Sequence, residues 1–331
     1  MATTENRASA DQLVARPPLR ELVDDLRERR ERARRGGGEE KIERQHSQDK
    51  LTARERLALL IDEGTFNELG IHGRPHFSQR SMEGKEAPAD GVVTGYGKVD
   101  GRLVAVAAYD FTVMAGSMGM TGELKVARLR ELALGKRIPM IWLLDSAGAR
   151  IQEASGSLFA GSGHLFREEV VMSGVIPQVA ALMGPCAAGT AYIPGLADFV
   201  PMVKGRGSMA LAGPHLTKAV TGEDVTQEEL GGSRVHTRVS GVGDLEVDSD
   251  EDCIQAIKDY LSFFPANCEQ QPPLREGPDP VERMDEELLD VLPDSPRKPY
   301  DMYEVIGRIV DDGKWFDLKP RWARTIITCL A

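Results

Sequence analysis

Two short turns built from small residues are the part of this sequence best suited to chemistry. The first reads Asp145-Ser-Ala-Gly-Ala and the second reads Gly184-Pro-Cys-Ala-Ala-Gly. Residues without large side chains let backbone N–H groups approach a ligand closely. Two such turns facing one another would offer two N–H donors to one oxygen, which is an oxyanion hole. In a site shielded from water, each donor contributes roughly 2.7–4 kcal/mol to transition-state stabilisation.

The segments that precede the two turns match one another. Ile138-Pro139 and Ile176-Pro177 each open an apolar run, IPMIWLLD and IPQVAALMG, that leads into a turn. Strands separated by helical segments pair in parallel through right-handed crossovers. Parallel pairing brings both turns to the carboxyl edge of one sheet, where ligands usually bind in open α/β folds. We therefore expect the two turns to face one another.

Side chains that could act as catalysts are fewer and weaker candidates. Cys186 is either a nucleophile or a buried inert thiol, and its apolar surroundings without a neighbouring histidine favour the thiol. His164 falls in an expected helix, where a packed histidine competes with a general base. The glycines of GSMGMTG are spaced G-x-x-G-x-x-G, unlike the dinucleotide motif. The sequence thus predicts that the protein stabilises an enolate while the reagents handle the protons.

The composition excludes several classes of function. The net charge is −11 and the pI is about 5.2, which argues against binding to nucleic acid or to an anionic membrane. The four cysteines form no C-x-x-C pair, so we expect neither a structural metal nor disulfides, and a cytoplasmic location. The N-terminus shows no apolar signal region. Residues 170–197 are uncharged, but their prolines and glycines break any spanning helix, so we expect a buried core segment.

Several elements are expected to position the turns. Residues 18–66 read as charged helices, whose arginine-rich run either holds phosphates or forms a solvated face, and Thr52 with Glu55 predicts a capping box. GVVTGYGKVDGRLVAVAAYDF predicts two strands joined at Asp100-Gly101. GELKVARLRELALGKR predicts a helix, SLFAGSGHLFREEVVMSG mainly a helix, and the small residues after IPQVAALMG the start of another. DFVPMV and SMALAG read as further strands, and TQEELGG lies in an exposed stretch.

The C-terminal region has a different composition. Eight prolines lie between Pro265 and Pro299, which is typical of an extended linker. DMYEVIGRIVDDGKWFDL then predicts a helix and a short strand. The last residues, ARTIITCLA, read as an apolar strand whose unpaired edge is a liability, so we expect it to open a further unit of structure.

Six motifs in one order carry a resemblance to a known family. They are KLTARER, YDFTVMAGSMG, DSAGARIQE, SGVIPQVAALMGPCAAG, GEDVTQEELGG and YDMYEVIGRIVDDGKWFDLKP. Together, over residues 42–331, they resemble the carboxyltransferase (beta) subunit of biotin-dependent acyl-CoA carboxylases of the propionyl-CoA carboxylase type.

The resemblance implies an α/β fold, a crotonase-like (ClpP/crotonase) spiral of ββα units behind a charged N-terminal helical extension. It implies three regions: the extension (1–66), an acyl-CoA-binding N-terminal carboxyltransferase domain (67–264), and a Pro-rich linker with the truncated start of the C-terminal domain (265–331). The implied reaction transfers a carboxyl group from carboxybiotin to the α-carbon of a short-chain acyl-CoA, such as propionyl-CoA or acetyl-CoA. Biotin would arrive on a separate carrier protein with its biotin carboxylase. No metal is implied in this chain, and the active site would form between subunits of a ring-like hexamer.

The resemblance also implies roles for individual residues. The backbone N–H groups of Ala147, Gly148, Ala188 and Gly189 would form the oxyanion hole for the thioester. Substrate-binding positions would be Ser146, Ala149, Arg150, Gly184, Cys186, Ala187 and Lys125. The two basic residues in this set are equally open to a structural interpretation.

Three departures from the family pattern leave alternatives open. Ala147 and Ala188 stand where the family usually has glycine, and an alanine is strained if its φ is positive. The chain ends near the first strand of the second domain, so we expect another polypeptide to supply the biotin-side half and to pair with the terminal strand. The alternatives are a biotin-dependent decarboxylase subunit, a non-catalytic acyl-CoA-binding or assembly subunit, and a fragment of an interrupted gene. A serine hydrolase would need a Ser–His pair that the sequence does not display.

Overall fold

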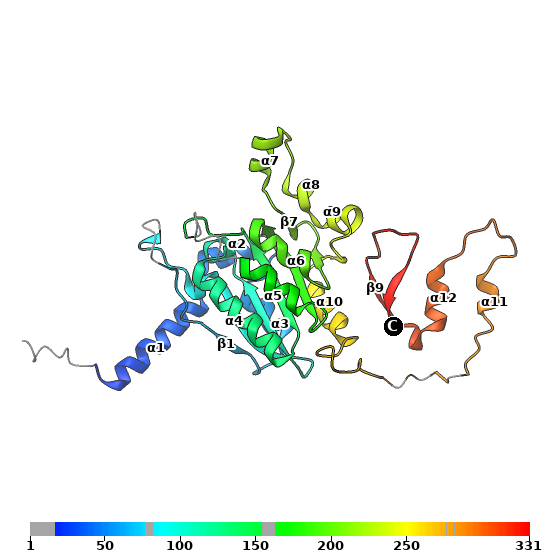
Figure 1. The fold of residues 1–331 in the computed structure, drawn as a ribbon, viewed down its shortest axis with the longest axis horizontal. Coiled ribbons are helices and arrows are strands. Elements are labelled where there is room, and N and C mark those ends of the chain that lie inside the picture. Colours follow the sequence, from blue (N-terminus) through cyan, green and yellow to red (C-terminus); the bar gives the residue numbers. More distant parts are fainter. Residues whose placement is uncertain (1–16, 77–81, 154–162, 276, 278, 281) are drawn as a thin grey trace, which may run out of the picture.

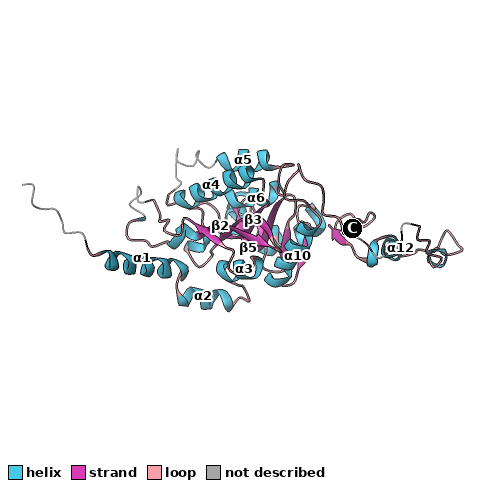
Figure 2. Cartoon of the chain, turned by 90° about the horizontal axis from the view of Figure 1, so that it is seen from below, coloured by secondary structure: helices cyan, strands magenta, loops and turns pink. Residues whose placement is uncertain are grey.

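The computed structural model describes every residue except 1–16, 77–81, 154–162, 276, 278 and 281. Its centre is an eight-stranded sheet in the order β1-β2-β3-β4-β5-β6-β8, with β7 beside β5. The strands are β1 (Asn67–Leu69), β2 (Val92–Val99), β3 (Arg102–Tyr109), β4 (Met140–Ser146), β5 (Gln178–Ala187), β6 (Pro201–Val203), β7 (Ser208–Ala210) and β8 (Leu245–Val247). Figure 2 shows α4 (Met120–Lys136) and α5 (His164–Met172) on one face, and α2 (Glu39–His46) and α3 (Ala53–Leu60) on the other. The predicted α/β class is confirmed.

The central strands are buried on both faces. In β4, Trp142 and Leu144 belong to the core under α4 and α5, whereas Ile141 and Leu143 belong to the core under α3 and α10 (Asp250–Ser262). A strand covered on both sides needs apolar residues at every position. This is why IPMIWLLD shows no alternation of polar and apolar residues.

The predicted strand pairing around the turns is confirmed. β2 and β3 form an antiparallel hairpin, and Asp100 and Gly101 at its tip have φ values of 49° and 80°, as a tight two-residue hairpin turn requires. β3, β4 and β5 pair in parallel. α4 and α5 supply the crossovers, and residues 157–162 of the segment predicted as mainly helical lie outside the described residues.

β5 is longer than the sequence predicts. The apolar run was expected to end at the glycine-proline pair and to give way to a helix there. The strand continues to Ala187 because Pro185–Ala187 pair with β7. Only then do the short helices η5 (Ala188–Ala191) and α6 (Tyr192–Leu196) begin. The donor groups of the second turn therefore sit at the very end of a strand.

The N-terminal helices differ in how they pack. α1 (Leu19–Arg34) buries only Ala33, and its arginines pair with acids one turn away, as Arg29 does with Asp25. The arginine-rich run is thus a solvated face. α3 begins with the predicted capping box of Thr52 and Glu55, and its Leu57 and Leu60 enter the core. Part of the region assigned to the extension is therefore built into the sheet domain.

Residues 265–331 lie outside the main sheet (Figure 1). The described residues from 266 to 287 form no helix or strand, as expected of the Pro-rich linker. The predicted helix and strand that follow are α12 (Met302–Ile309) and β9 (Phe316–Leu318), after the short α11 (Leu288–Val291). The terminal strand β10 (Thr328–Leu330) pairs antiparallel with β9. One edge of the terminal strand is therefore paired within the chain, and its pairing with another polypeptide stays a prediction for the other edge.

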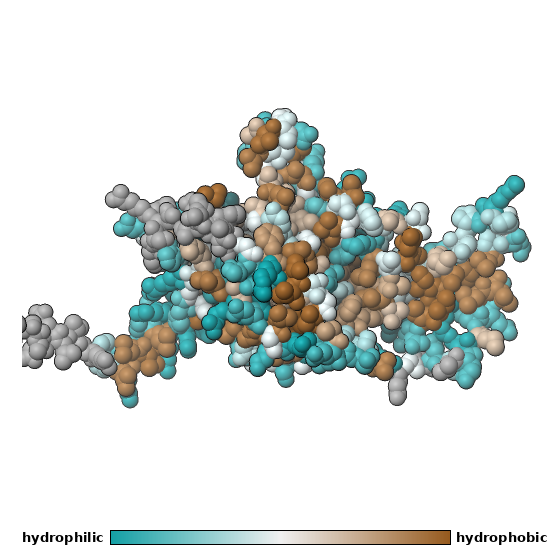
Figure 3. All heavy atoms as spheres, viewed as in Figure 1, coloured by the Kyte–Doolittle hydropathy of each residue, from teal (hydrophilic) through white to brown (hydrophobic). Residues whose placement is uncertain are grey.

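A pair of projecting helices forms one surface feature that bears on the site. α7 (Pro214–Thr221) and α8 (Gln227–Gly231) project from the sheet domain (Figure 1), and apolar residues gather on this projection in Figure 3. Its exposed apolar side chains include Leu211, Leu216 and Val220. Within the described part of the chain, no helix has the length and apolar character needed to cross a membrane. The uncharged segment instead forms the end of α5, β5, η5 and α6, much of it in the core as predicted.

Candidate functional site

The structure brings the two small-residue turns together. Ser146 pairs with Cys186 in parallel register, so both turns leave the same edge of the sheet. Gly148 lies directly against the second turn, because a Cβ at this position would be 2.5 Å from the Ala187 carbonyl oxygen and 3.2 Å from the Ala188 Cβ. Only glycine allows this approach, and its φ of 93° also favours glycine.

The first turn leaves one donor for a ligand. The N–H of Ala147 donates to the Ala115 carbonyl at 2.9 Å, and the N–H of Gly148 donates to Ser146 Oγ at 3.1 Å. Ala149 forms a parallel bridge with Met118, in which the hydrogen bonds use its two chain neighbours. The N–H of Ala149 therefore points to the other side, toward the end of β5. It has no acceptor among the residues that the structure describes.

The second turn leaves one donor. The first N–H groups of a helix have no partner within it. In η5 the N–H of Gly189 has no acceptor among the residues that the structure describes, whereas the N–H of Ala188 faces the Ala210 carbonyl in the parallel ladder between β5 and β7. A Cβ on Gly189 would meet nothing within 4 Å, so the space beside it is open. The available donors are thus those of Ala149 and Gly189, a different set from the one that the resemblance implies.

Ser146 and Cys186 have structural surroundings. The Ser146 hydroxyl donates to the Gly116 carbonyl at 2.7 Å and accepts from Gly148, so it is committed within the protein. Cys186 is 1% exposed, and burial raises the pKa of its thiol to about 12. A neutral buried thiol is a poor nucleophile. Among the described residues, no group of three acidic, histidine or cysteine side chains is arranged to hold a metal ion.

The two basic candidates also point into the protein. Arg150 is buried and donates to Glu153 at 2.9 Å, to the Ser117 carbonyl at 2.9 Å and to Asp90. Lys125 donates to the Ala89 and Val92 carbonyls at 2.7 and 2.6 Å, and burial lowers its pKa to about 8. These partners favour the structural interpretation of both residues.

Sequence reasoning missed a buried carboxylate at the root of the first turn. Asp145 accepts hydrogen bonds from Gln45, Lys50 and Arg56 at 2.9, 2.8 and 3.0 Å. Gly184 makes room for it, since a Cβ there would be 2.0 Å from Asp145 Oδ1. One signal was present: a charged residue ending an apolar buried strand must find buried partners. Nothing in the local sequence says which distant residues supply them.

A cavity of 260 Å³ opens beside the turns. Its lining includes Ala147 from the first turn, Cys186 and Ala187 from the second, Phe111, and Pro214 and Leu230 from the projecting helices. Pockets that enclose drug-sized ligands measure roughly 300–1,000 Å³. The smaller volume suits a short acyl group better than a whole coenzyme A molecule.

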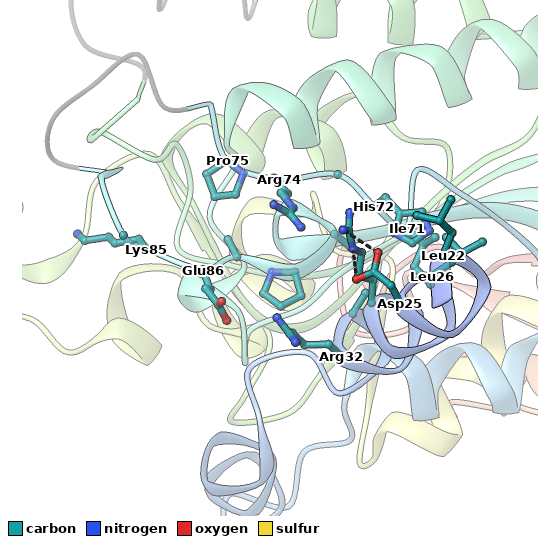
Figure 4. Close-up of a pocket in the computed structure, with 17 residues that line it drawn as sticks. Leu22, Asp25, Leu26, Arg32, Ile71, His72, Arg74, Pro75, Lys85 and Glu86 are labelled. Atoms are coloured by element: carbon teal, nitrogen blue, oxygen red, sulfur yellow. Dashed lines mark hydrogen bonds and ion pairs between the residues drawn. The ribbon is translucent and has the colours of Figure 1, made fainter. Parts of the chain in front are cut away.

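A larger cavity of 740 Å³ lies elsewhere, between α1 and residues 71–75 and 84–89. Figure 4 shows Arg32 and Arg74 on opposite sides of it. None of its described lining residues belongs to either turn. Its size alone does not make it the reactive site, because residues of both turns line the smaller cavity.

Ala188 carries strain that can be measured. Its φ is 50°, a region that costs an L-residue with a Cβ roughly 1–2 kcal/mol. We expect Ala188→Gly to raise the free energy of unfolding by up to about 1 kcal/mol, after the entropy that glycine adds to the unfolded chain. Urea denaturation would measure this. The matched variant Ala187→Gly, at an ordinary φ of −108°, should be destabilising, and equal effects at both positions would contradict the strain.

The arrangement of the two turns also occurs in known proteins. A twisted sheet with backbone donors at two parallel strand ends is the arrangement of crotonase-like proteins. Residues 44–331 match the family model described as the carboxyl transferase domain. The chain belongs to the carboxyl transferase domain family.

Its relatives are longer proteins. It is 45% identical over 313 residues to the methylmalonyl-CoA decarboxylase subunit alpha of Veillonella parvula, covering 95% of this chain and 61% of the relative. It is 44% identical to the carboxyltransferase subunit of propionyl-CoA carboxylase from Haloferax mediterranei, covering 93% and 60%. A transcarboxylase 12S structure with hydrolysed methylmalonyl-coenzyme A bound has a TM-score of 0.90 at 40% identity, over 95% of this chain and 62% of that one. The chain thus spans about 60% of the length of these relatives.

Proposed function

We propose that this chain binds a short-chain acyl-CoA and stabilises its enolate during biotin-dependent carboxyl transfer. One observation carries the proposal: the open N–H groups of Ala149 and Gly189 belong to two turns that contact one another at neighbouring strand ends, beside a small, largely apolar cavity that both turns help to line. The thioester oxygen would lie between the turns, and the acyl chain would enter the cavity. The names of the relatives, which act on propionyl-CoA and methylmalonyl-CoA, support this substrate class.

The chemistry required of this chain is electrostatic. When the α-proton leaves, negative charge moves onto the thioester oxygen, where the backbone donors stabilise it. The donors are already fixed in place, so they need no reorganisation as charge develops. The committed Ser146 hydroxyl and the neutral Cys186 thiol leave the turns without a side-chain nucleophile. The carbon nucleophile is therefore the enolate of the substrate itself.

We propose two kinds of partner. Carboxybiotin, on a carrier protein loaded by a biotin carboxylase, supplies the carboxyl group, and we assign no residue of this chain to it. A homo- or hetero-oligomer completes the biotin side of the site, in line with the hexamer named for the transcarboxylase structure. The exposed apolar side chains on the projection beside the cavity are suited to such a contact.

Biotin-dependent decarboxylation is the second candidate. The Veillonella parvula relative at 45% identity favours it. Loss of the carboxyl group from methylmalonyl-CoA leaves the same enolate, so the same turns would serve. Carboxyl transfer from methylmalonyl-CoA to free biotin would measure this direction. A binding subunit without catalysis is the third candidate, favoured by the strain and the methyl group of Ala188.

The test compares propionyl-CoA with S-propyl-CoA, a thioether that lacks only the carbonyl oxygen. Two hydrogen bonds to that oxygen, each worth about 0.5–1.5 kcal/mol, predict that the thioester binds about tenfold more tightly. Calorimetric titration of the full chain would give both dissociation constants. Equal affinities would remove the oxyanion hole from the proposal.

Catalysis has its own readout. With a buffer base present to accept the α-proton, a stabilised enolate accelerates exchange of the α-protons of propionyl-CoA in D2O, which NMR follows directly. Binding with thioester preference but no accelerated exchange would favour the non-catalytic subunit.

A further inference from the structure

A buried guanidinium bridges the two strands just before their turns. Arg56 of α3 is 1% exposed. Its Nη1 donates to Asp145 Oδ2 at 3.0 Å, and its Nη2 donates to the Met183 carbonyl at 3.1 Å. Asp145 is the first residue of the first turn, and Met183 directly precedes Gly184, the first residue of the second. One side chain therefore contacts the root of both turns.

The sheet is irregular at this level, so the strands alone do not set the spacing of the turns. Leu144 pairs with Leu182, and the next pair is Ser146 with Cys186. One residue of β4 thus lies opposite residues 183–185 of β5, and the regular ladder is interrupted. The carboxylate of Asp145 occupies the space beside Gly184 at this irregularity. The guanidinium of Arg56 donates a hydrogen bond to the same carboxylate.

The bridge is itself held from two sides. Arg56 Nε donates to Asp250 Oδ2 on α10 at 2.7 Å, and the same oxygen accepts from the Leu51 N–H at 3.0 Å. Asp145 is also held by Lys50 Nζ at 2.8 Å, and this ammonium lies 4.4 Å from the ring centre of Phe111, which lines the cavity. The buried carboxylates of Asp145 and Asp250 thus offset the positive charges of the buried side chains Lys50 and Arg56. The planar fork of arginine reaches three acceptors at once, which a lysine ammonium at the end of a flexible stem does not.

We propose that Arg56 is a positioning residue that sets the separation of the two backbone-donor turns. The proposal rests on the proposed function, because it assigns Arg56 to the recognition of the thioester carbonyl. Ala149 and Gly189 lie only a few residues beyond the two acceptors, so a shift at the bridge moves the donors. A misplacement of about 1 Å at a reactive centre can cost about a hundredfold in rate. The helical region that the sequence assigned to an extension thereby becomes part of the site's support.

Arg56→Lys tests the proposal in the full chain, with propionyl-CoA and S-propyl-CoA as probes. We expect the thioester preference to fall from about tenfold to within about threefold of unity, while the thioether affinity stays within about twofold. If Arg56 contributed only to the stability of the fold, Arg56→Lys would weaken the binding of both ligands by a similar factor. The matched control is Arg130→Lys, because Arg130 of α4 is equally buried but pairs with Glu123 of α4 and Glu168 of α5. It should leave the preference unchanged.

The outcomes separate the two proposals. A wild-type chain without thioester preference overturns the proposed function, whatever Arg56 does. A wild-type preference that survives Arg56→Lys, or that Arg130→Lys removes equally, overturns the role of Arg56. If thermal denaturation shows that Arg56→Lys does not fold, Asp145→Asn is measured instead, since it weakens the same bridge at one strand. An unchanged preference in that variant also overturns the role.

Discussion

Gly148→Ala is expected to abolish thioester recognition and to slow α-proton exchange of propionyl-CoA about 100-fold or more. The added Cβ would lie 2.5 Å from the Ala187 carbonyl oxygen, a distance that real Cβ atoms do not reach. Both neighbours are backbone or Cβ atoms, so no flexible side chain can move aside. The turns must separate, and the donors on them then no longer converge on one oxygen. Loss of one oxyanion donor alone costs about 10²–10³ in rate.

The control for Gly148→Ala must reproduce the backbone strain without the contact. Gly174 has a comparable φ of 72°, and a Cβ there would meet nothing within 4 Å. It lies before β5, at the opposite end of the strand from the turn. Gly174→Ala should lose stability but keep the thioester preference and the exchange rate. If Gly148→Ala retains both, the close approach of the two turns has no role in binding.

Glu169→Gln is expected to remove most of the loss of stability that the protein suffers as the pH rises from about 5 to 8. Glu169 is 1% exposed on α5, and neither of its carboxylate oxygens has a partner among the described residues. Burial raises its pKa to about 8, opposed by the charge of Arg130 and assisted by Glu123 and Glu168. Tyr109 of β3 and Cys186 of β5 also face this carboxyl group. The folded protein therefore holds a neutral carboxylic acid at this position.

The sign follows from proton linkage. Between an unfolded pKa near 4.5 and a folded pKa of about 8, the folded state binds one more proton than the unfolded state. The stabilisation is complete below pH 4.5 and is lost as the pH rises through 8. A shift of this size corresponds to about 3–5 kcal/mol in the free energy of unfolding. Glutamine keeps the shape of the neutral acid and does not titrate.

Urea denaturation at several pH values would measure the difference between wild type and Glu169→Gln. That difference should change by several kcal/mol across the window, in favour of the variant at high pH. Glu131→Gln, at an exposed glutamate of α4, should give a small difference that is the same at every pH. Parallel curves for wild type and Glu169→Gln would show that Glu169 ionises normally in the folded protein.

The secondary structure around the site was predictable because its signals are local. The Asp100-Gly101 hairpin, the capping box at Thr52 and the apolar strands before both turns all follow from short stretches of sequence. The end of β5 was misplaced because it depends on β7, more than twenty residues further along the chain. The pairing of β10 with β9 was missed for the same reason. A strand end is decided by its neighbour, which a local pattern does not name.

The donor groups of the two turns show the same difference between local sequence signals and contacts that depend on the fold. The small residues of the two turns and their common edge of the sheet could be inferred from the sequence alone. Which N–H groups remain available could not be inferred, because Ala115 and Ser146 take up two of the donors in the first turn through contacts that only the fold creates.

What the amino-acid sequence determined by itself was the class of the fold, the place of the two turns and the family. These depend on periodicity, turn chemistry and motif order, which are properties of neighbouring residues. What only the tertiary structure decided was the contact of Gly148 with Ala187 and the bridge that Arg56 builds between β4 and β5. Both depend on atoms from distant parts of the chain meeting in the interior. There, a buried charge must find its partner in space and not along the sequence.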